Sequence, residues 1–266
     1  MHNAEIEKKI RAALERDTRI NLHRDPIEID FDGASVTLSG EVADIAAKRL
    51  ALEHAASLSE VAGIVDRLRV RPGERMGDGA IAAHIERSLV EDSAFGGFII
   101  RTRVGDVPKH GSTAEQRASS SGYARDARSV DAGGAGAGGE DGLPRPPWIE
   151  IGVDDGVVTL VGDVPSLSHK RLAGVLAWWA PGTRDVVNGL GVEPDEEDTD
   201  EEIVDALRIV LDKDPTVDAT QIRATCKNGV VTLEGLVRDE AHRDLVEFDA
   251  WALFGVDNVV NRIDVP

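Results

Sequence analysis

The chain has 266 residues, of which 41% are hydrophobic and 30% charged, and its formal net charge is −19. This length exceeds what one small core needs and suits three small domains. Residues 1–75 hold 14 acids and 12 bases, whereas residues 193–266 hold 20 acids and 7 bases. Because this excess of negative charge repels the phosphate backbones of nucleic acids, the composition excludes a general nucleic-acid-binding protein.

The start of the chain runs directly into an amphipathic helical pattern, without the apolar stretch and cleavage site of a secretory signal. No segment approaches the roughly 18 apolar residues that span a bilayer. The single cysteine, Cys226, has no partner for an internal disulfide, which is typical of a reducing compartment. We therefore expect a cytoplasmic location.

Each third of the chain begins with apolar residues at helical spacing. Asp78 and either Thr199 or Asp200 are expected to cap the second and third of these helices, because a short side-chain oxygen accepts from first-turn amides. The apolar faces comprise Ile6, Ile10, Ala13 and Leu14; Ile81, Ile85 and Leu89; and Ile203, Leu207, Val210 and Leu211.

A hairpin is predicted after each first helix. In the first third, Ile27, Ile29 and Phe31 alternate with acids, as in a half-buried strand. The turns are predicted at Asp32-Gly33, Asp155-Gly156 and Asn228-Gly229, since these residue types tolerate positive φ. The second hairpin strand reads Val-Thr-Leu-x-Gly and is expected to end, with a bend or bulge, at Gly40, Gly162 and Gly235.

A second helix is predicted at about 44–58, 166–180 and 239–254. A final strand follows it, whose matched valine stands 25 residues past each glycine, at Val65, Val187 and Val260. Identical spacing in three places indicates one repeated unit. The predicted fold class is α+β: three tandem αββαβ modules, each with two helices on a three-stranded mixed sheet. The predicted module boundaries are 1–72, 76–193 and 199–266.

The second module is interrupted by a segment at about 103–147 that is rich in Gly, Ser and Pro. This composition predicts a long flexible insertion. Residues 98–100, just before it, are compatible with an extra strand or with local packing. An acidic linker at 193–202 leads into the third module.

The repeated helix, the turn glycine, the Val-Thr-Leu-x-Gly strand and the late valine followed by Asp66, Asn188 or Asn261 resemble the BON domain, named from bacterial osmotically inducible and nodulation proteins. The resemblance covers nearly the whole chain apart from the insertion and the linker. It implies an αββαβ module without catalytic activity. It also implies roles in phospholipid or membrane association and in envelope or osmotic stress protection.

Three groups of residues are candidate sites. The matched trio Asp66, Asn188 and Asn261 is predicted to bond the backbone where the second helix leads into the last strand. Trp178 and Trp251 hold equivalent positions late in the second helices, where large aromatics usually anchor packing between modules; exposed, they suit a partner or a membrane interface. The alternating Arg67, Arg69 and Arg71 form a candidate contact for a protein partner or for lipid phosphates.

No motif predicts catalysis. Glu28-x-Asp30-x-Asp32-Gly33 resembles half a calcium loop, but Ser39 stands where a bidentate Glu is required. Cys226 falls on the inward register of its strand, which favours a buried apolar role. We expect a non-enzyme that needs no cofactor and no metal.

Two hypotheses of function remain. The first is a stress-associated interaction or scaffold protein whose modules bind protein partners, including copies of itself. The alternative is a peripheral phospholipid-binding protein at the membrane surface, linked to envelope or osmotic stress.

Overall fold

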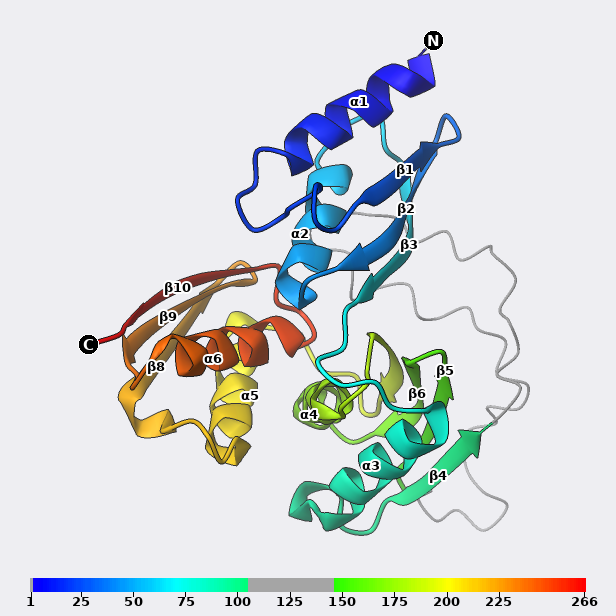
Figure 1. The fold of residues 1–266 in the computed structure, drawn as a ribbon. Helices are drawn as coiled ribbons and strands as arrows, with labels where there is room; N and C mark the ends of the chain where they lie inside the picture. The colour runs from blue at the N-terminus through cyan, green and yellow to red at the C-terminus, as the bar shows by residue number, and fades with distance from the viewer. Residues whose placement is uncertain (1, 105–145) are drawn as a thin grey trace.

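The computed structural model describes residues 2–104 and 146–266. It consists of three similar modules, each with two helices on one face of a sheet (Figure 1). The second helix of the third module, α6 (Glu240–Ala252), contacts the second helices of the other two, α2 (Ile45–Ala56) and α4 (Leu167–Trp179). The predicted α+β class with three helix-on-sheet modules is confirmed.

Module 1 has the predicted αββαβ order. Its sheet is mixed, because β2 pairs antiparallel with β1 and parallel with β3. The apolar face of α1 packs on this sheet, where Ile6, Ile10 and Leu14 have no exposed surface. The elements are α1 (His2–Leu14), β1 (Ile27–Phe31), β2 (Ser35–Val42), α2 (Ile45–Ala56) and β3 (Gly63–Val70).

Module 2 adds a fourth strand to the same plan. Residues 99–104 form β4, which runs parallel to β5 with Ile99 beside Trp148 and Val104 beside Val153. The extra strand left open by the sequence is therefore present. The elements are α3 (Asp78–Glu91), a 3-10 turn (Ser93–Phe95), β4 (Ile99–Val104), β5 (Trp148–Asp154), β6 (Val157–Val164), α4 (Leu167–Trp179) and β7 (Asp185–Val192). Most of the segment at 103–147 lies outside the described residues.

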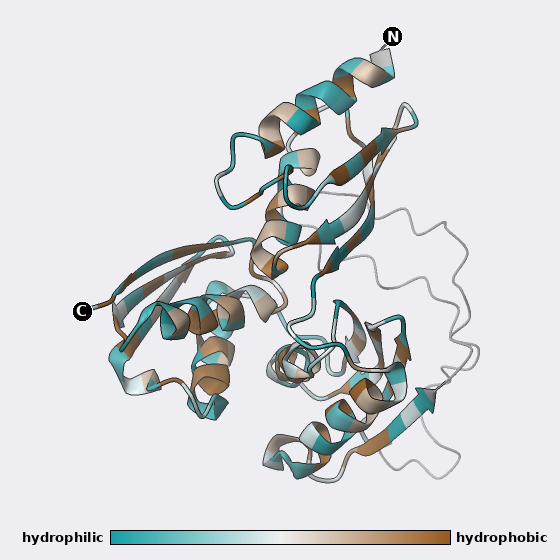
Figure 2. Ribbon diagram, in the orientation of Figure 1, coloured by the Kyte–Doolittle hydropathy of each residue, from teal (hydrophilic) through white to brown (hydrophobic). Residues whose placement is uncertain are grey.

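Module 3 returns to three strands, in the order β10-β9-β8. Its first helix is strongly amphipathic. Figure 2 shows the hydrophobic residues of the helices gathered toward the sheets. The elements are α5 (Asp200–Lys213), a 3-10 turn (Ala219–Gln221), β8 (Ile222–Lys227), β9 (Val230–Leu236), α6 (Glu240–Ala252) and β10 (Asn258–Asp264).

The first helices of modules 2 and 3 hold the hairpin turns by a carboxylate. Asp200 accepts from the amides of Asn228 (2.7 Å) and Gly229 (2.9 Å), and Asp78 accepts from the two turn amides of module 2 at 3.0 and 2.9 Å. Thr199 caps α5 as expected, with its side chain accepting from the Glu202 amide. The expected cap at Asp78 is wrong: the cap position is Gly77, because the Asp78 carboxylate faces the hairpin instead.

The repeated glycine does not end its strand. β6 continues past Gly162 to Val164, still paired with β7, so the prediction of a strand end there is wrong. Gly162 has φ +148°, and a Cβ at this position would lie 2.0 Å from the Trp148 carbonyl oxygen. Gly40 and Gly235 repeat this geometry. Glycine is required here because the first hairpin strand begins directly against its Cα.

Candidate interaction surfaces and the junctions between modules

A buried lysine joins modules 1 and 2. The Lys48 ammonium on α2 lies 2.8 Å from an Asp66 oxygen and 2.7 Å from an Asp185 oxygen of module 2, and it donates to the Leu68 carbonyl at 2.9 Å. Its side chain is 6% exposed. Burial raises the pKa of Asp66, the Asp185 charge adds to this, and Lys48 opposes it. The cation therefore compensates two carboxylates from different modules.

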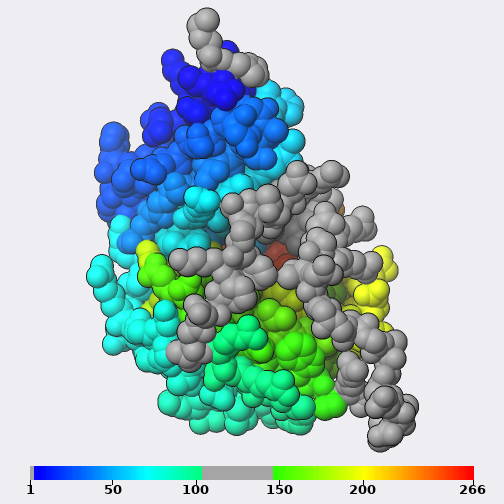
Figure 3. Space-filling model, turned by 90° about the vertical axis from the view of Figure 1, so that its right-hand side faces the viewer, coloured from blue at the N-terminus to red at the C-terminus, as the bar shows by residue number. Residues whose placement is uncertain are grey.

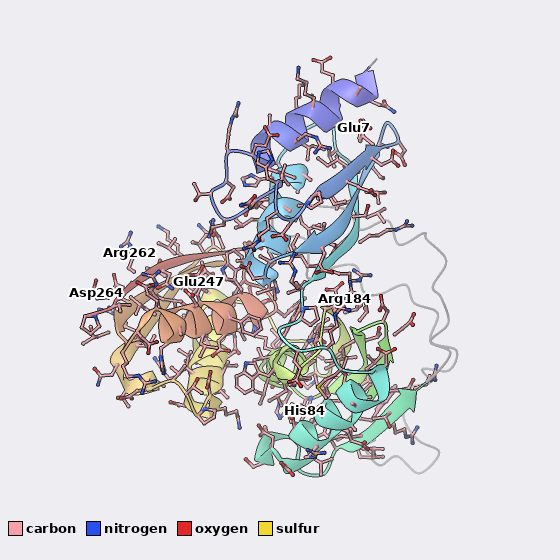
Figure 4. The ribbon with its side chains drawn as sticks, in the orientation of Figure 1. Glu7, His84, Arg184, Glu247, Arg262 and Asp264 are labelled. Carbon is pink, nitrogen blue, oxygen red and sulfur yellow. The ribbon has the colours of Figure 1, made fainter. Side chains whose placement is uncertain are left out.

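Backbone and side-chain contacts near Lys48 also join modules 1 and 2. The Val70 amide at the end of β3 donates to the Arg184 carbonyl at 2.8 Å, and Arg69 donates to Asp185 at 3.0 Å. Figure 4 labels Arg184 between the two modules, where its guanidinium lies 2.8 Å from Asp155 and 3.5 Å from Glu41 of module 1. In Figure 3 module 1 (blue) rests directly on module 2 (cyan and green).

The matched trio lies under the second helices. The side-chain oxygens of Asp66, Asn188 and Asn261 each accept from the amide two residues later, at 2.9, 3.4 and 3.1 Å. The Asn188 amide also donates to the Lys170 carbonyl at 2.8 Å, and Asn261 donates to the Arg243 carbonyl at 3.4 Å. In module 1 the equivalent position to these carbonyl residues is Lys48, whose ammonium meets Asp66. The trio thus fastens each second helix to its last strand.

Two arginines at equivalent positions hold one loop of module 3. On α2, the Arg49 guanidinium donates to the Val256 carbonyl at 2.9 Å and to the Leu253 carbonyl at 3.2 Å. On α4, Arg171 has no exposed surface, donates to the Phe254 carbonyl at 3.0 Å, and pairs with Asp198 of the acidic linker. The loop between α6 and β10 is therefore bound from both sides.

In module 3, the position equivalent to Arg49 and Arg171 is occupied by Asp244, which is exposed. The repeat of basic contacts therefore stops at α6.

A buried acid lies between modules 2 and 3. The Trp179 indole donates to one Asp249 oxygen at 2.8 Å, and the other oxygen has no partner among the described residues. Asp249 is 1% exposed, and burial raises its pKa to about 7; the Trp179 bond opposes this and the Asp214 carboxylate adds to it. The equivalent residue in module 2 is Leu176, so this carboxyl group occupies an apolar position of the repeat.

Asp249 gives the fold a pH dependence of known sign. Because its folded pKa is about 7 against an ordinary 3.8, the folded state holds this proton more tightly. Its contribution is full below about pH 4 and is lost as the pH rises to about 7. We expect Asp249→Asn to remove that decline from the free energy of unfolding, measured by urea titration across this range. The exposed Asp244→Asn is the control, and a decline that persists in Asp249→Asn contradicts the assignment.

The two matched tryptophans lie in different settings. Trp251 is 1% exposed, with the Arg19 guanidinium of module 1 5.9 Å from its ring centre, so it offers no free surface in this arrangement. Trp178 is partly buried against the core. Lys170 on α4 lies 4.6 Å from the ring centre of Phe254, and burial lowers its pKa, opposed by Asp198. Aromatic and cationic groups of neighbouring modules thus meet inside the molecule.

The arginine row is largely engaged within the chain. Arg69 pairs with Asp185, and Arg71 pairs with Asp25 and, at 2.9 Å, with Glu41. Arg67 is exposed and forms no ion pair within the described residues. Only Arg67 of the three therefore offers an unengaged guanidinium.

The outer faces of the sheets carry most of the exposed apolar side chains. Val161 is 45% and Val187 50% exposed on adjacent strands of module 2, and Leu236 is 51% exposed on β9. Gly189 and Gly191 leave this face of module 2 shallow. Among helical residues, Val90 on α3 is 64% exposed.

The single cysteine, Cys226, lies on β8 of module 3. Cys226 is half-buried and its Sγ lies 3.2 Å from an Asp200 oxygen; burial and then Asp200 raise its pKa to about 12. The expected burial is therefore only partial.

No group of three or more His, Cys, Asp or Glu residues within 2–104 and 146–266 is placed to hold a metal ion. No helix in the same ranges is long and apolar enough to cross a membrane.

Sequence reasoning missed the groups that join the modules. Lys48, Arg49, Arg171 and Asp249 lie on helices whose charged residues resemble an ordinary solvated face. A signal was nonetheless present: aligning the three modules puts Asp249 where module 2 has Leu176 and puts Arg49 beside Arg171.

These features define a class of protein: tandem small helix-on-sheet modules that are joined by their second helices. A family model described as BON domain matches residues 2–72, 139–194 and 199–266, and the chain belongs to the BON domain family. No curated protein matches the chain.

The comparison with solved structures finds two that are similar to this chain. One is the C-terminal domain of CdsD, a structural protein of the type III secretion system of Chlamydia trachomatis. Its identity is 14% and its TM-score 0.23, with 97% of this chain and 95% of that chain covered. A second CdsD structure has 13% identity and a TM-score of 0.23, with 98% and 92% covered. Similarity at this TM-score supports no functional argument.

Proposed function

We propose that this protein is a non-catalytic interaction scaffold, associated with stress, that presents its three sheets to protein partners. The supporting observation is how the module surfaces are divided. The second helices and their loops are used in packing between modules, through Lys48, Arg49 and Arg171. The outer sheet faces carry exposed apolar side chains instead, with Val187 half exposed. Exposed apolar patches on a folded protein suit partner binding.

The alternative, binding to phospholipid at a membrane surface, depends on different groups. It requires basic and aromatic side chains that are free to reach headgroups. Trp251 is buried, and Arg69 and Arg71 are in ion pairs. These placements favour protein contact over lipid contact, and the experiment below separates the two.

The test places a photoreactive amino acid at Val187 of the full chain, in cells of the source organism. We expect a specific protein to be cross-linked from Val187, but not from Val90, which is equally apolar and more exposed but lies on a helix. The purified partner should bind the wild-type chain and the Val90→Glu variant, and it should bind Val187→Glu at least about tenfold more weakly, the loss expected for a central contact.

Identical cross-links from both positions contradict the proposal. So does flotation of the purified chain with anionic liposomes in a manner that Arg67→Ser weakens, which supports the lipid alternative.

A further inference from the structure

The three modules present equivalent edge strands, which are β1, β5 and β8. In module 2 this edge is covered by β4, which pairs parallel to β5 along six residues. In the described residues, β1 pairs only with β2, and β8 pairs only with β9. Two sheet edges of the same type are therefore left open at opposite ends of the chain.

The hairpins fix which backbone groups point out of each open edge. Paired residues of an antiparallel ladder alternate between bonding their partner and facing away. The Asp32 amide bonds the Ser35 carbonyl at 3.1 Å, so Ile27 and Ile29 direct their N–H and C=O groups outward. By the same alternation, the outward groups of β8 belong to Ile222, Ala224 and Cys226, because Lys227 faces Val230 across the two-residue turn.

The covered edge in module 2 shows what an added strand does. Beneath β4, Ile149 and Ile151 of β5 have no exposed surface. At the same register of β8, Ile222 and Ala224 are only half-buried. A strand beside β8 would therefore bury an apolar row and pair backbone groups that now face solvent.

The α1 helix partly covers the β1 edge. The Glu7 side chain accepts from the Phe31 amide at 3.3 Å, and Asn3 donates to the Phe31 carbonyl at 2.9 Å. At the position equivalent to Glu7, α5 carries Val204, which has no polar group to bond β8. The β8 edge is thus the more open of the two, and β1 remains open at Ile27 and Ile29.

The two open edges carry opposite charges on the outer sheet face. β1 exposes Glu28 and Asp30, and β8 exposes Arg223 and Lys227. None of these four forms an ion pair within the described residues. Cross-strand pairs of opposite charge stabilise a sheet, whereas like charges directly opposite destabilise it. Pairing β1 with β1 brings acids together, and pairing β8 with β8 brings bases together.

We propose that β1 of one copy of this chain pairs antiparallel with β8 of a second copy. With Ile29 opposite Ala224, Asp30 lies opposite Arg223, and Glu28 lies opposite Thr225 and diagonal to Lys227. Because β1 and β8 are equivalent strands, antiparallel pairing keeps the helices of both modules on the same side of one continuous six-stranded sheet. This inference rests on the proposed interaction function and names a second copy as one partner.

The contact uses a different patch on each copy, so it is heterologous. A pair of copies therefore keeps a free β8 on one copy and a free β1 on the other. Such contacts extend into filaments unless they close into a ring. The edge of β4 is also basic but fits β1 less well, because Arg103 is paired with Glu150 at 2.9 Å and Thr102 stands at the inward register beside Ile151.

The test is the association of the purified full chain, measured by sedimentation velocity over a range of concentrations at low salt. We expect wild-type oligomers that weaken with added salt. Glu28→Lys with Asp30→Lys, or Arg223→Glu with Lys227→Glu, should each weaken association about tenfold or more, because two pairs become repulsive. An equimolar mixture of the two double variants should associate like the wild type, since both of its mixed contacts are complementary.

The matched control is Arg101→Glu, an exposed arginine on the β4 edge, which should leave association unchanged. Disulfide trapping detects association that is too weak for sedimentation. In a Cys226→Ala background, Glu28→Cys combined with Thr225→Cys should form disulfides between copies. A monomer at all concentrations with no trapped oligomer overturns the proposal, as does association lost with Arg101→Glu or kept in both double variants. A monomer whose Val187 position still captures a partner overturns self-pairing and leaves the interaction function standing.

Discussion

Replacing Lys48 with alanine is expected to lower the free energy of unfolding by about 3 kcal/mol or more. The ammonium lies within 2.8 Å of carboxylates from two modules, and both carboxylates are mostly buried, with Asp185 10% and Asp66 22% exposed. Without the lysine, two negative charges face each other in a poorly solvated junction. The loss is measured by urea denaturation followed by circular dichroism at neutral pH.

Two variants frame this result. Lys9→Ala removes an exposed pair with Glu60 and should lower the free energy of unfolding far less, because exposed ion pairs contribute little to stability. Lys48→Met combined with Asp66→Asn removes one charge of each sign, leaves Asp185 paired with Arg69, and should recover most of the lost stability, because replacing a buried ion pair by neutral groups often costs little. A Lys48→Ala loss no larger than that of Lys9→Ala contradicts the described junction.

Gly162→Ala is expected to lower the free energy of unfolding by about 3 kcal/mol or more. The backbone at Gly162 has φ +148°, which a side chain adopts only under strain, and the added Cβ would lie 2.0 Å from the Trp148 carbonyl oxygen. The start of β5 must then move away from β6. Thermal and urea unfolding both report this loss.

Gly33→Ala is the matched control for steric crowding. Gly33 also has a positive φ, +106°, but nothing lies within 4 Å of a Cβ there. Only the backbone term remains, so its expected cost is about 1 kcal/mol. Equal losses for Gly33 and Gly162 would show that the close contact with Trp148 does not determine the requirement for glycine.

The sequence predicted the modules well because their local signals repeat. Helical apolar spacing, a turn glycine and a fixed interval to the last strand occur together in all three modules. A fold can be predicted from sequence when such local signals all indicate the same structure. The strand end at Gly162 was misplaced because glycine was interpreted as a break. The structure uses its missing Cβ to let one strand begin against the middle of another.

The junctions could not be predicted in the same way. The burial of Lys48 depends on Asp185, which lies 137 positions away in sequence and in another module. The matched trio lies on the last strands, but its further partners differ: Asp66 pairs with the Lys48 ammonium, Asn188 donates to the Lys170 carbonyl, and Asn261 donates to both the Arg243 carbonyl and the Glu247 carboxylate. The arginine row was interpreted as one free face, but docking of module 2 engages Arg69.

The two arginines that hold the loop between α6 and β10 have a consequence for synthesis. Arg49 lies 207 residues before the Val256 carbonyl that it binds. At about 5–20 residues per second, the ribosome takes about 10 to 40 seconds to cover that interval. During this time the first module exists without the loop of module 3, so the two bonds from Arg49 to the Val256 and Leu253 carbonyls form only after the last part of the chain has been made.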